Sequence, residues 1–116
     1  MPGSGTLTLS GTIVGYPTGQ RTVNVQWPLP AAVDESTSSN LSIGDNQFGI
    51  PGGASIVIIE PPDGNVVPIV LKGASGDLGL VLHPTLAHVQ SINVAMGSFI
   101  LNISQVLVGP VQITFF

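Results

Sequence analysis

Residues 55–82 have the sequence SIVIIEPPDGNVVPIVLKGASGDLGLVL, and this stretch decides the fold class. It contains three short apolar runs, at 55–60, 66–72 and 78–82, which are separated by Pro, Gly, Asp and Asn. Short runs rich in Val, Ile and Leu between such turn formers are typical of buried β-strands. The stretch therefore predicts three consecutive strands, and the polar turn at 61–64 predicts that the first two form a hairpin.

Toward the N-terminus the pattern predicts another hairpin. Thr and Leu alternate through residues 6–14, and Gly and Pro then turn the chain. The alternation resumes at 22–27, where Val23, Val25 and Trp27 fall on one face of an extended strand.

Residues 28–46 differ in composition and show no strong hydrophobic period. They are rich in Pro, Ala, Ser, Thr and Asn, which favour irregular structure. We expect a long surface loop here, with one short strand or turn near 41–43.

The C-terminal part predicts three further strands, at 88–94, 98–103 and 111–116. In the last of them the alternation places Phe115 on the face that is expected to be buried and Phe116 on the opposite face. A polar sequence would favour a frayed end, so two aromatic residues here indicate a strand that is tied into a sheet or a neighbour.

These elements define the expected architecture. Eight or nine short strands at a spacing of about 8 to 12 residues are typical of an all-β sandwich or barrel. No internal repeat or linker divides the chain of 116 residues. We expect a single β domain over 1–116, folded as a jelly-roll-like β-sandwich.

The charge content is unusually low. Asp, Glu, Lys and Arg make up 7% of the chain, against about 25% in an average soluble domain. Lys72 and Arg21 are its only permanent cations, too few to neutralise the several phosphates on which nucleic-acid affinity depends. A surface of hydroxyls and amides is less costly to cover than one of ions, so it favours permanent protein contacts.

Other classes of protein are excluded on similar grounds. With 0 cysteines the chain has no disulfide framework, zinc thiolate site or thiol nucleophile. No apolar run approaches the roughly 18 residues that cross a bilayer. The first residues, MPGSGTLTLSG, lack the basic and apolar regions of a Sec-type signal, so we expect none.

The two histidines are the only candidates for a metal ligand or a general base. His83 and His88 are separated by Pro84 and a strand boundary, which gives them no common face. Neither has a pair of carboxylates near it in the sequence. We therefore expect structural or surface histidines.

Ser75 lies in Gly-Ala-Ser-Gly-Asp, which superficially resembles a nucleophile turn. A nucleophile elbow places Gly two residues after Ser and leads into a helix, whereas here Asp77 occupies that position and a strand is expected to follow. The sequence therefore predicts an ordinary turn.

The carboxylates are scattered along the chain. Asp34 and Glu35 are adjacent, which on a strand would direct them to opposite faces. The other four are expected in or beside separate turns, where Asp is a common turn former: Asp45 (with Asn46), Glu60, Asp63 and Asp77. No calcium loop of the usual length is present, although a weak cation site on a loop stays open.

Residues 56–85, IVIIEPPDGNVVPIVLKGASGDLGLVLHPT, combine several turns in a distinctive order. An apolar strand ends in Pro-Pro, a polar turn follows, the next strand ends in Leu-Lys-Gly, and a Gly-Asp-x-Gly turn leads into another apolar strand. With this order, residues 48–116 resemble small β-rich proteins encoded among the structural genes of tailed bacteriophages. The resemblance implies a virion component such as a capsid decoration (cement) protein, a fibre or collar module, or a tail subunit. It carries over no functional residue.

We accordingly expect a non-enzymatic virion structural protein, and first a capsid decoration protein that acts by multivalent protein–protein packing. Its expected partners are copies of itself and a major capsid or other virion protein, in a virion assembled in the host cytoplasm. No cofactor, metal, nucleic acid or membrane is expected. Trp27, Phe48 and Phe116 are the candidate interface residues. The alternative is a fibre, collar or tail module that binds a ligand or carbohydrate, for which Trp27, Tyr16 and Phe48 are the available aromatics.

Overall fold

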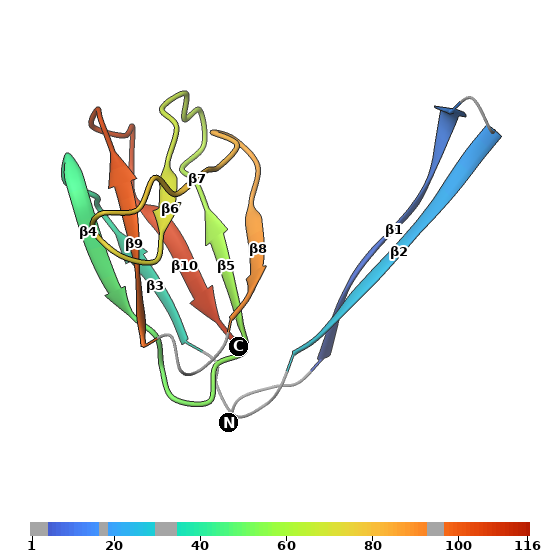
Figure 1. Cartoon of the computed structure of the whole chain (residues 1–116), viewed down its shortest axis with the longest axis horizontal. Helices are drawn as coiled ribbons and strands as arrows, with labels where there is room; N and C mark the ends of the chain where they lie inside the picture. The colour runs from blue at the N-terminus through green and yellow to red at the C-terminus, as the bar shows by residue number, and fades with distance from the viewer. Residues whose placement is uncertain (1–4, 17–18, 30–34, 93–96) are drawn as a thin grey trace.

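The computed structural model describes residues 5–16, 19–29, 35–92 and 97–116, and every regular element in these ranges is a β-strand. Ten strands are present, so the all-β prediction is confirmed (Figure 1). Their bounds are β1 Gly5–Tyr16, β2 Gly19–Leu29, β3 Glu35–Ser39, β4 Gly44–Gly49, β5 Ile56–Glu60, β6 Val70–Lys72, β7 Leu80–Val81, β8 His88–Ser91, β9 Ser98–Ile103 and β10 Val111–Phe115.

Strands β1 and β2 form a hairpin, as their alternation predicts. They pair antiparallel from Gly5 opposite Leu29 to Ile13 opposite Arg21, and the register shifts between Ile13 and Tyr16. This two-stranded sheet is separate from the other eight strands.

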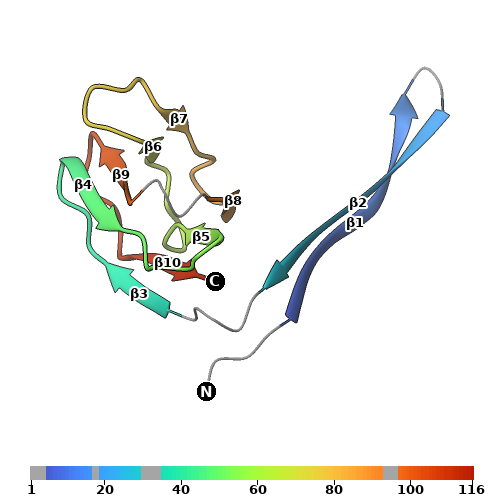
Figure 2. The same cartoon turned by 60° about the horizontal axis from the view of Figure 1, so that its bottom comes forward.

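The remaining strands form two antiparallel sheets of four, in the orders β3-β10-β5-β8 and β4-β9-β6-β7. The sheets face one another as the two layers of a β-sandwich (Figures 1 and 2). The predicted sandwich is therefore confirmed.

The pairings within the sandwich are nested. β3 pairs with β10, β4 with β9, β5 with β8 and β6 with β7, so the chain runs out to the β6–β7 turn and returns alongside itself. Two further pairings, β10 with β5 and β6 with β9, join these pairs into sheets. Strands β3 to β10 thus have the pairing of one long hairpin that is folded into two layers.

The expectation of a long loop over 28–46 is wrong for its C-terminal part. Residues 28–29 end β2, 35–39 form β3, and 44–46 begin β4. Where one short strand or turn was expected near 41–43, the chain bends at Ile43 and connects β3 to β4. β3 has no apolar period because it is an edge strand with polar contacts. The Ser38 hydroxyl donates a hydrogen bond of 2.7 Å to Oε1 of Gln112 on β10.

The hairpin expected from 55–60 and 66–72 is also wrong. β5 and β6 lie in different sheets, and residues 61–69 cross between them. Val67 and Ile69 are buried in the core on the way, which explains their apolar character without a strand. β6 instead pairs with β7, and both are shorter than expected. The expected strand at 88–94 ends at Ser91, and its residues 93 and 94 lie outside the described ranges.

The core lies between the sheets, and β10 shows how it is built. Val111, Ile113 and Phe115 are buried, whereas the residues between them are half-buried, as the alternation predicts. The ring of Phe99 packs against two other rings, with centroid distances of 5.6 Å to Phe48 and 6.1 Å to Phe115. The buried apolar cluster comprises Leu41, Ala54, Val57, Ile59, Val67, Ile69, Leu82, Phe99, Leu101, Ile103, Leu107, Val111, Ile113 and Phe115.

Candidate functional site

Four connections meet at one end of the sandwich, which we call the loop end. They are residues 40–43, 61–69, 82–87 and 104–110, and they follow β3, β5, β7 and β9 respectively. The antiparallel register brings the C-terminal ends of these strands to the same side, and all four loops lie at the top of the sandwich in Figure 1.

Within residues 36–92 and 97–116, the loop end carries most of the large aliphatic residues that are exposed. Each of its four loops contributes at least one, and their exposed fractions lie between 61% and 79%. A single exposed aliphatic residue is normal, whereas a gathering of them marks an interaction surface. The residues are Ile43, Val66, Leu86, Val106 and Val108.

Buried neighbours flank three of these residues, on two of the loops. Leu107 is buried between Val106 and Val108, so the loop presents both valines to solvent. In the same way the buried pair Asn65 and Val67 flanks Val66. The core beneath the loops therefore fixes the positions of Val66, Val106 and Val108.

Asn65 links two of the loops. It is 0% exposed, and its Nδ2 donates hydrogen bonds to the carbonyl oxygens of Val67 at 2.8 Å and Pro84 at 2.7 Å. Its Oδ1 accepts the backbone N–H of Val67 at 3.2 Å. The sequence places Asn65 in a turn but contains no signal of this connection between 61–69 and 82–87.

The loop end is nearly free of charge. Asp63 is the only Asp, Glu, Lys or Arg in the four loops. His83 is the other ionisable residue, and its Nδ1 accepts the backbone N–H groups of Thr85 at 3.2 Å and Leu86 at 3.3 Å. His83 therefore shapes the loop that presents Leu86.

His88 lies in β8 and has a separate partner, since its Nε2 is 3.1 Å from Oε1 of Gln90. The structure does not join the two histidines in one hydrogen-bonded group. Within the described residues, no three His, Cys, Asp or Glu side chains cluster as a metal site would require.

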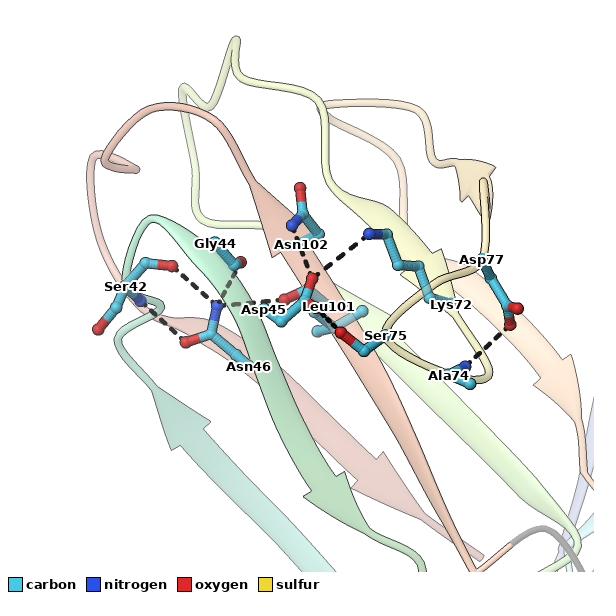
Figure 3. A network of polar contacts seen from close by, with 10 residues as sticks. All are labelled: Ser42, Gly44, Asp45, Asn46, Lys72, Ala74, Ser75, Asp77, Leu101 and Asn102. Atoms are coloured by element: carbon cyan, nitrogen blue, oxygen red, sulfur yellow. Dashed lines mark hydrogen bonds and ion pairs between the residues drawn. The ribbon is translucent and has the colours of Figure 1, made fainter.

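A polar network occupies the outer face of the β4-β9-β6-β7 sheet (Figure 3). The carboxylate of Asp45 on β4 accepts hydrogen bonds from Nδ2 of Asn102 at 2.7 Å and from the hydroxyl of Ser75 at 2.9 Å. Nζ of Lys72 completes the group with an ion pair of 3.4 Å. Asp45 thus joins β4, β9, β6 and the β6–β7 turn.

The electrostatic consequence is a stabilised carboxylate. The hydrogen bonds from Asn102 and Ser75, together with Lys72, hold the pKa of Asp45 below its ordinary value of 3.8, although partial desolvation opposes them. The Ser75 hydroxyl is donated to a carboxylate, and no described histidine hydrogen-bonds to it. The arrangement can fasten a turn to a sheet.

The predictions for the other turn residues have mixed outcomes. Asp45 and Asn46 were expected in or beside a turn, and they lie in β4 directly after the bend at Ile43, which Asn46 caps through Ser42. Asp77 does close its turn, because its Oδ2 accepts the N–H of Ala74 at 2.9 Å. Asp34 lies outside the described residues.

The three candidate interface residues are not brought together. Trp27 lies in the hairpin opposite Leu7, and Phe48 is half-buried against the core. Phe116 is half-buried at the end of the sandwich away from the loop end, where its N–H donates to the carbonyl of Ile56 at 2.9 Å. A role for each in binding stays a prediction.

Two clefts open between the sheets at their free edges. One, of about 200 Å³, lies between β8 and β7 and is lined by residues such as Val57, Leu71 and Phe99. The other, of about 350 Å³, lies between β3 and β4 and is lined by residues such as Thr37, Phe48 and Phe115. Neither brings an acid and a base together.

In comparisons with known proteins, no family model matches the chain, and neither does any curated protein or solved structure. Among the described residues there is no helix of the length and apolar character needed to cross a membrane.

Proposed function

We propose that this protein is a non-enzymatic structural component of a virion, and specifically a capsid decoration protein that docks through its loop end. The observation that carries the proposal is the set of five exposed aliphatic residues on four loops. A decoration protein needs a surface of this kind, because it must contact a preformed shell at a fixed orientation.

The strand order supports the proposal. An eight-stranded chain that pairs first with last, second with seventh, third with sixth and fourth with fifth, and wraps into two sheets, has the order of a jelly roll with two Greek keys. Jelly rolls are common in viral capsid proteins and in lectins. We therefore infer a jelly-roll sandwich, although the same fold also hosts unrelated functions.

The charge distribution supports a permanent contact. Asp63 is the one formal charge in the four loops, so covering them requires little ion desolvation. Burial of apolar surface then supplies the favourable free energy at roughly 25 cal/mol per Å².

The test measures binding of the full chain to purified particles of the virus that encodes it. Changing Val106→Asp and Val108→Asp together should abolish retention on the particles, because both positions are exposed at the loop end and a covered carboxylate would lack a partner. The fold should survive, since neither side chain is in the core.

Leu78→Asp provides the matched control. Leu78 is 97% exposed and lies in the β6–β7 turn, away from the loop end. This variant should bind as wild type does. Equal binding by both variants would refute docking through the loop end, and a copy number far below that of the shell protein would favour the fibre, collar or tail alternative.

A further inference from the structure

The hairpin β1–β2 has two chemically different faces. Residues that are register partners share a face, and every second residue along a strand does so too. One face is apolar except for Arg21. It carries Leu7, Leu9, Gly11 and Ile13 of β1 and Arg21, Val23, Val25 and Trp27 of β2. The other face, between the same limits, is polar: Thr8, Ser10 and Thr12 of β1 and Thr22, Asn24 and Gln26 of β2.

The described strands of the sandwich do not extend the sheet of this hairpin. None of the described sandwich strands pairs with β1 or β2, and the hairpin stands apart from the sandwich in both views (Figures 1 and 2). An isolated two-stranded sheet is marginally stable at best in water, and needs a further layer against its apolar face. The apolar face of the hairpin therefore needs a second layer that another molecule supplies.

We propose that this layer is the hairpin of a second copy of the chain. The two apolar faces pack against each other as a small four-stranded sandwich, with the two hairpins antiparallel about a two-fold axis. The proposal rests on the part of the proposed function in which the chain associates with itself, and it assigns that association to the hairpin.

The available area matches a dimer. Five aliphatic residues at roughly 60 to 120 Å² each and one tryptophan at about 150 to 250 Å² offer roughly 450 to 850 Å² per copy. Two copies would then bury about 900 to 1,700 Å², which overlaps the range of specific interfaces, about 1,200 to 2,000 Å².

The single charge on the face selects the antiparallel orientation. Arg21 lies opposite Ile13 near the hairpin turn, and Trp27 lies opposite Leu7 near the base, about 20 Å away at 3.3 Å per residue. A parallel dimer would bring two Arg21 residues together without any carboxylate on the face. In the antiparallel dimer each arginine instead meets the partner's tryptophan, where a cation–π contact is favourable.

Sedimentation of the full chain tests the association. Wild type should sediment as a dimer, and Val25→Asp should raise the dissociation constant by about 100-fold or more, because it places an unpaired carboxylate in the apolar layer. Asn24→Asp adds the same charge one residue away on the polar face, and should remain dimeric. A monomeric wild type, a trimer, or equal behaviour of the two variants would overturn the proposal.

Trp27 provides a second measurement, because it is the only tryptophan of the chain. Its emission should move to longer wavelength on dilution and in Val25→Asp, and should not move in Asn24→Asp. If Val25→Asp sediments as a monomer and its emission stays as blue-shifted as that of wild type, the apolar face is covered within one chain, which would overturn the proposal.

Cross-linking tests the orientation, since the chain contains 0 cysteines. A mixture of Leu7→Cys and Ile13→Cys copies treated with a short bismaleimide should give mixed cross-links in preference to either self-cross-link. Preferred self-cross-links would overturn the antiparallel arrangement. Because these tests use the isolated protein, failure to bind particles would refute the capsid role and leave the dimer standing.

Discussion

Asn65 is the single residue on which the shape of the loop end depends most. Its side chain satisfies both backbone groups of Val67 and the carbonyl of Pro84 from a fully buried position. Removing the amide leaves these groups without a partner, and a buried unsatisfied group costs about 1 to 3 kcal/mol. Asn65 is thus both a stability determinant and a positioning residue for Val66.

We expect Asn65→Ala to lower the free energy of unfolding by about 1 to 3 kcal/mol, as measured by denaturant titration. Asn40→Ala is the matched control, because Asn40 is exposed in another loop of the same end and should change stability by no more than about 0.5 kcal/mol. If the two substitutions have the same small effect, the buried amide does not hold the loops together.

For single residues, the sequence predicts local turn preference better than it predicts burial. Asp77 and Ser75 were expected in a turn and lie in one, because their turn is local and its residues have strong intrinsic preferences. Val66 and Val67 are chemically identical, yet one is exposed and the other buried. Only the path of the crossing segment decides this difference, so the loop end could not be predicted.

At the scale of the elements, the Asp45 network joins strands that are distant in the sequence. Its members come from β4, β9, β6 and the β6–β7 turn, and the carboxylate is the acceptor common to all of them. The β6–β7 turn also depends on Gly79, whose φ is +78° and where a Cβ would come within 2.6 Å of Cγ1 of Val70. The β6–β7 turn is therefore held by the carboxylates of Asp45 and Asp77 and by the conformation of Gly79.

The Asp45 network predicts a pH dependence. The folded-state pKa of Asp45 is depressed, so its contribution to stability is present above its ordinary pKa of 3.8 and is lost as the pH falls through the depressed value. Asp45→Asn should have a lower free energy of unfolding than wild type at neutral pH. The difference between the two free energies should become smaller in acid. Denaturant titrations across this range would measure it.

Asp63→Asn serves as the control for that series, because Asp63 is exposed on a loop outside the network. It should leave the acid dependence unchanged. A difference between wild type and Asp45→Asn that stays constant with pH would show that the carboxylate charge does not stabilise the fold.

The strands themselves were predictable where they are apolar, whether alternating as in β1, β2 and β10 or nearly continuous as in β9. β3 was missed because its Ser and Thr residues pair across a sheet edge through hydroxyls, as Ser36 does with Thr114 at 3.2 Å. Such a strand has no hydrophobic period to detect. The false hairpin at 55–72 has the opposite cause, since buried crossing residues imitate a strand.

At the scale of the whole molecule, the chain has two separate apolar surfaces with few charges, which are the loop end and the apolar face of the hairpin. The loop end lies at one end of the sandwich, and the hairpin extends from the side of the other end (Figure 1). If both surfaces bind as proposed, a dimer would present two loop ends, and docking would be bivalent. Linking two sites in this way raises overall affinity without any new contact.

The composition of both surfaces predicts how this assembly responds to salt. One charged residue lies in the loops and one on the apolar face of the hairpin, so few ion pairs are available for screening. Sodium chloride and sodium sulfate at matched ionic strength screen charges alike, but sulfate strengthens apolar burial because it is excluded from protein surfaces. The dissociation constant of the dimer should therefore change little in chloride and fall in sulfate, which sedimentation can measure. Dissociation in moderate chloride would instead mean that the carboxylates elsewhere in the chain carry the association, since only charge pairs weaken as the ionic strength rises.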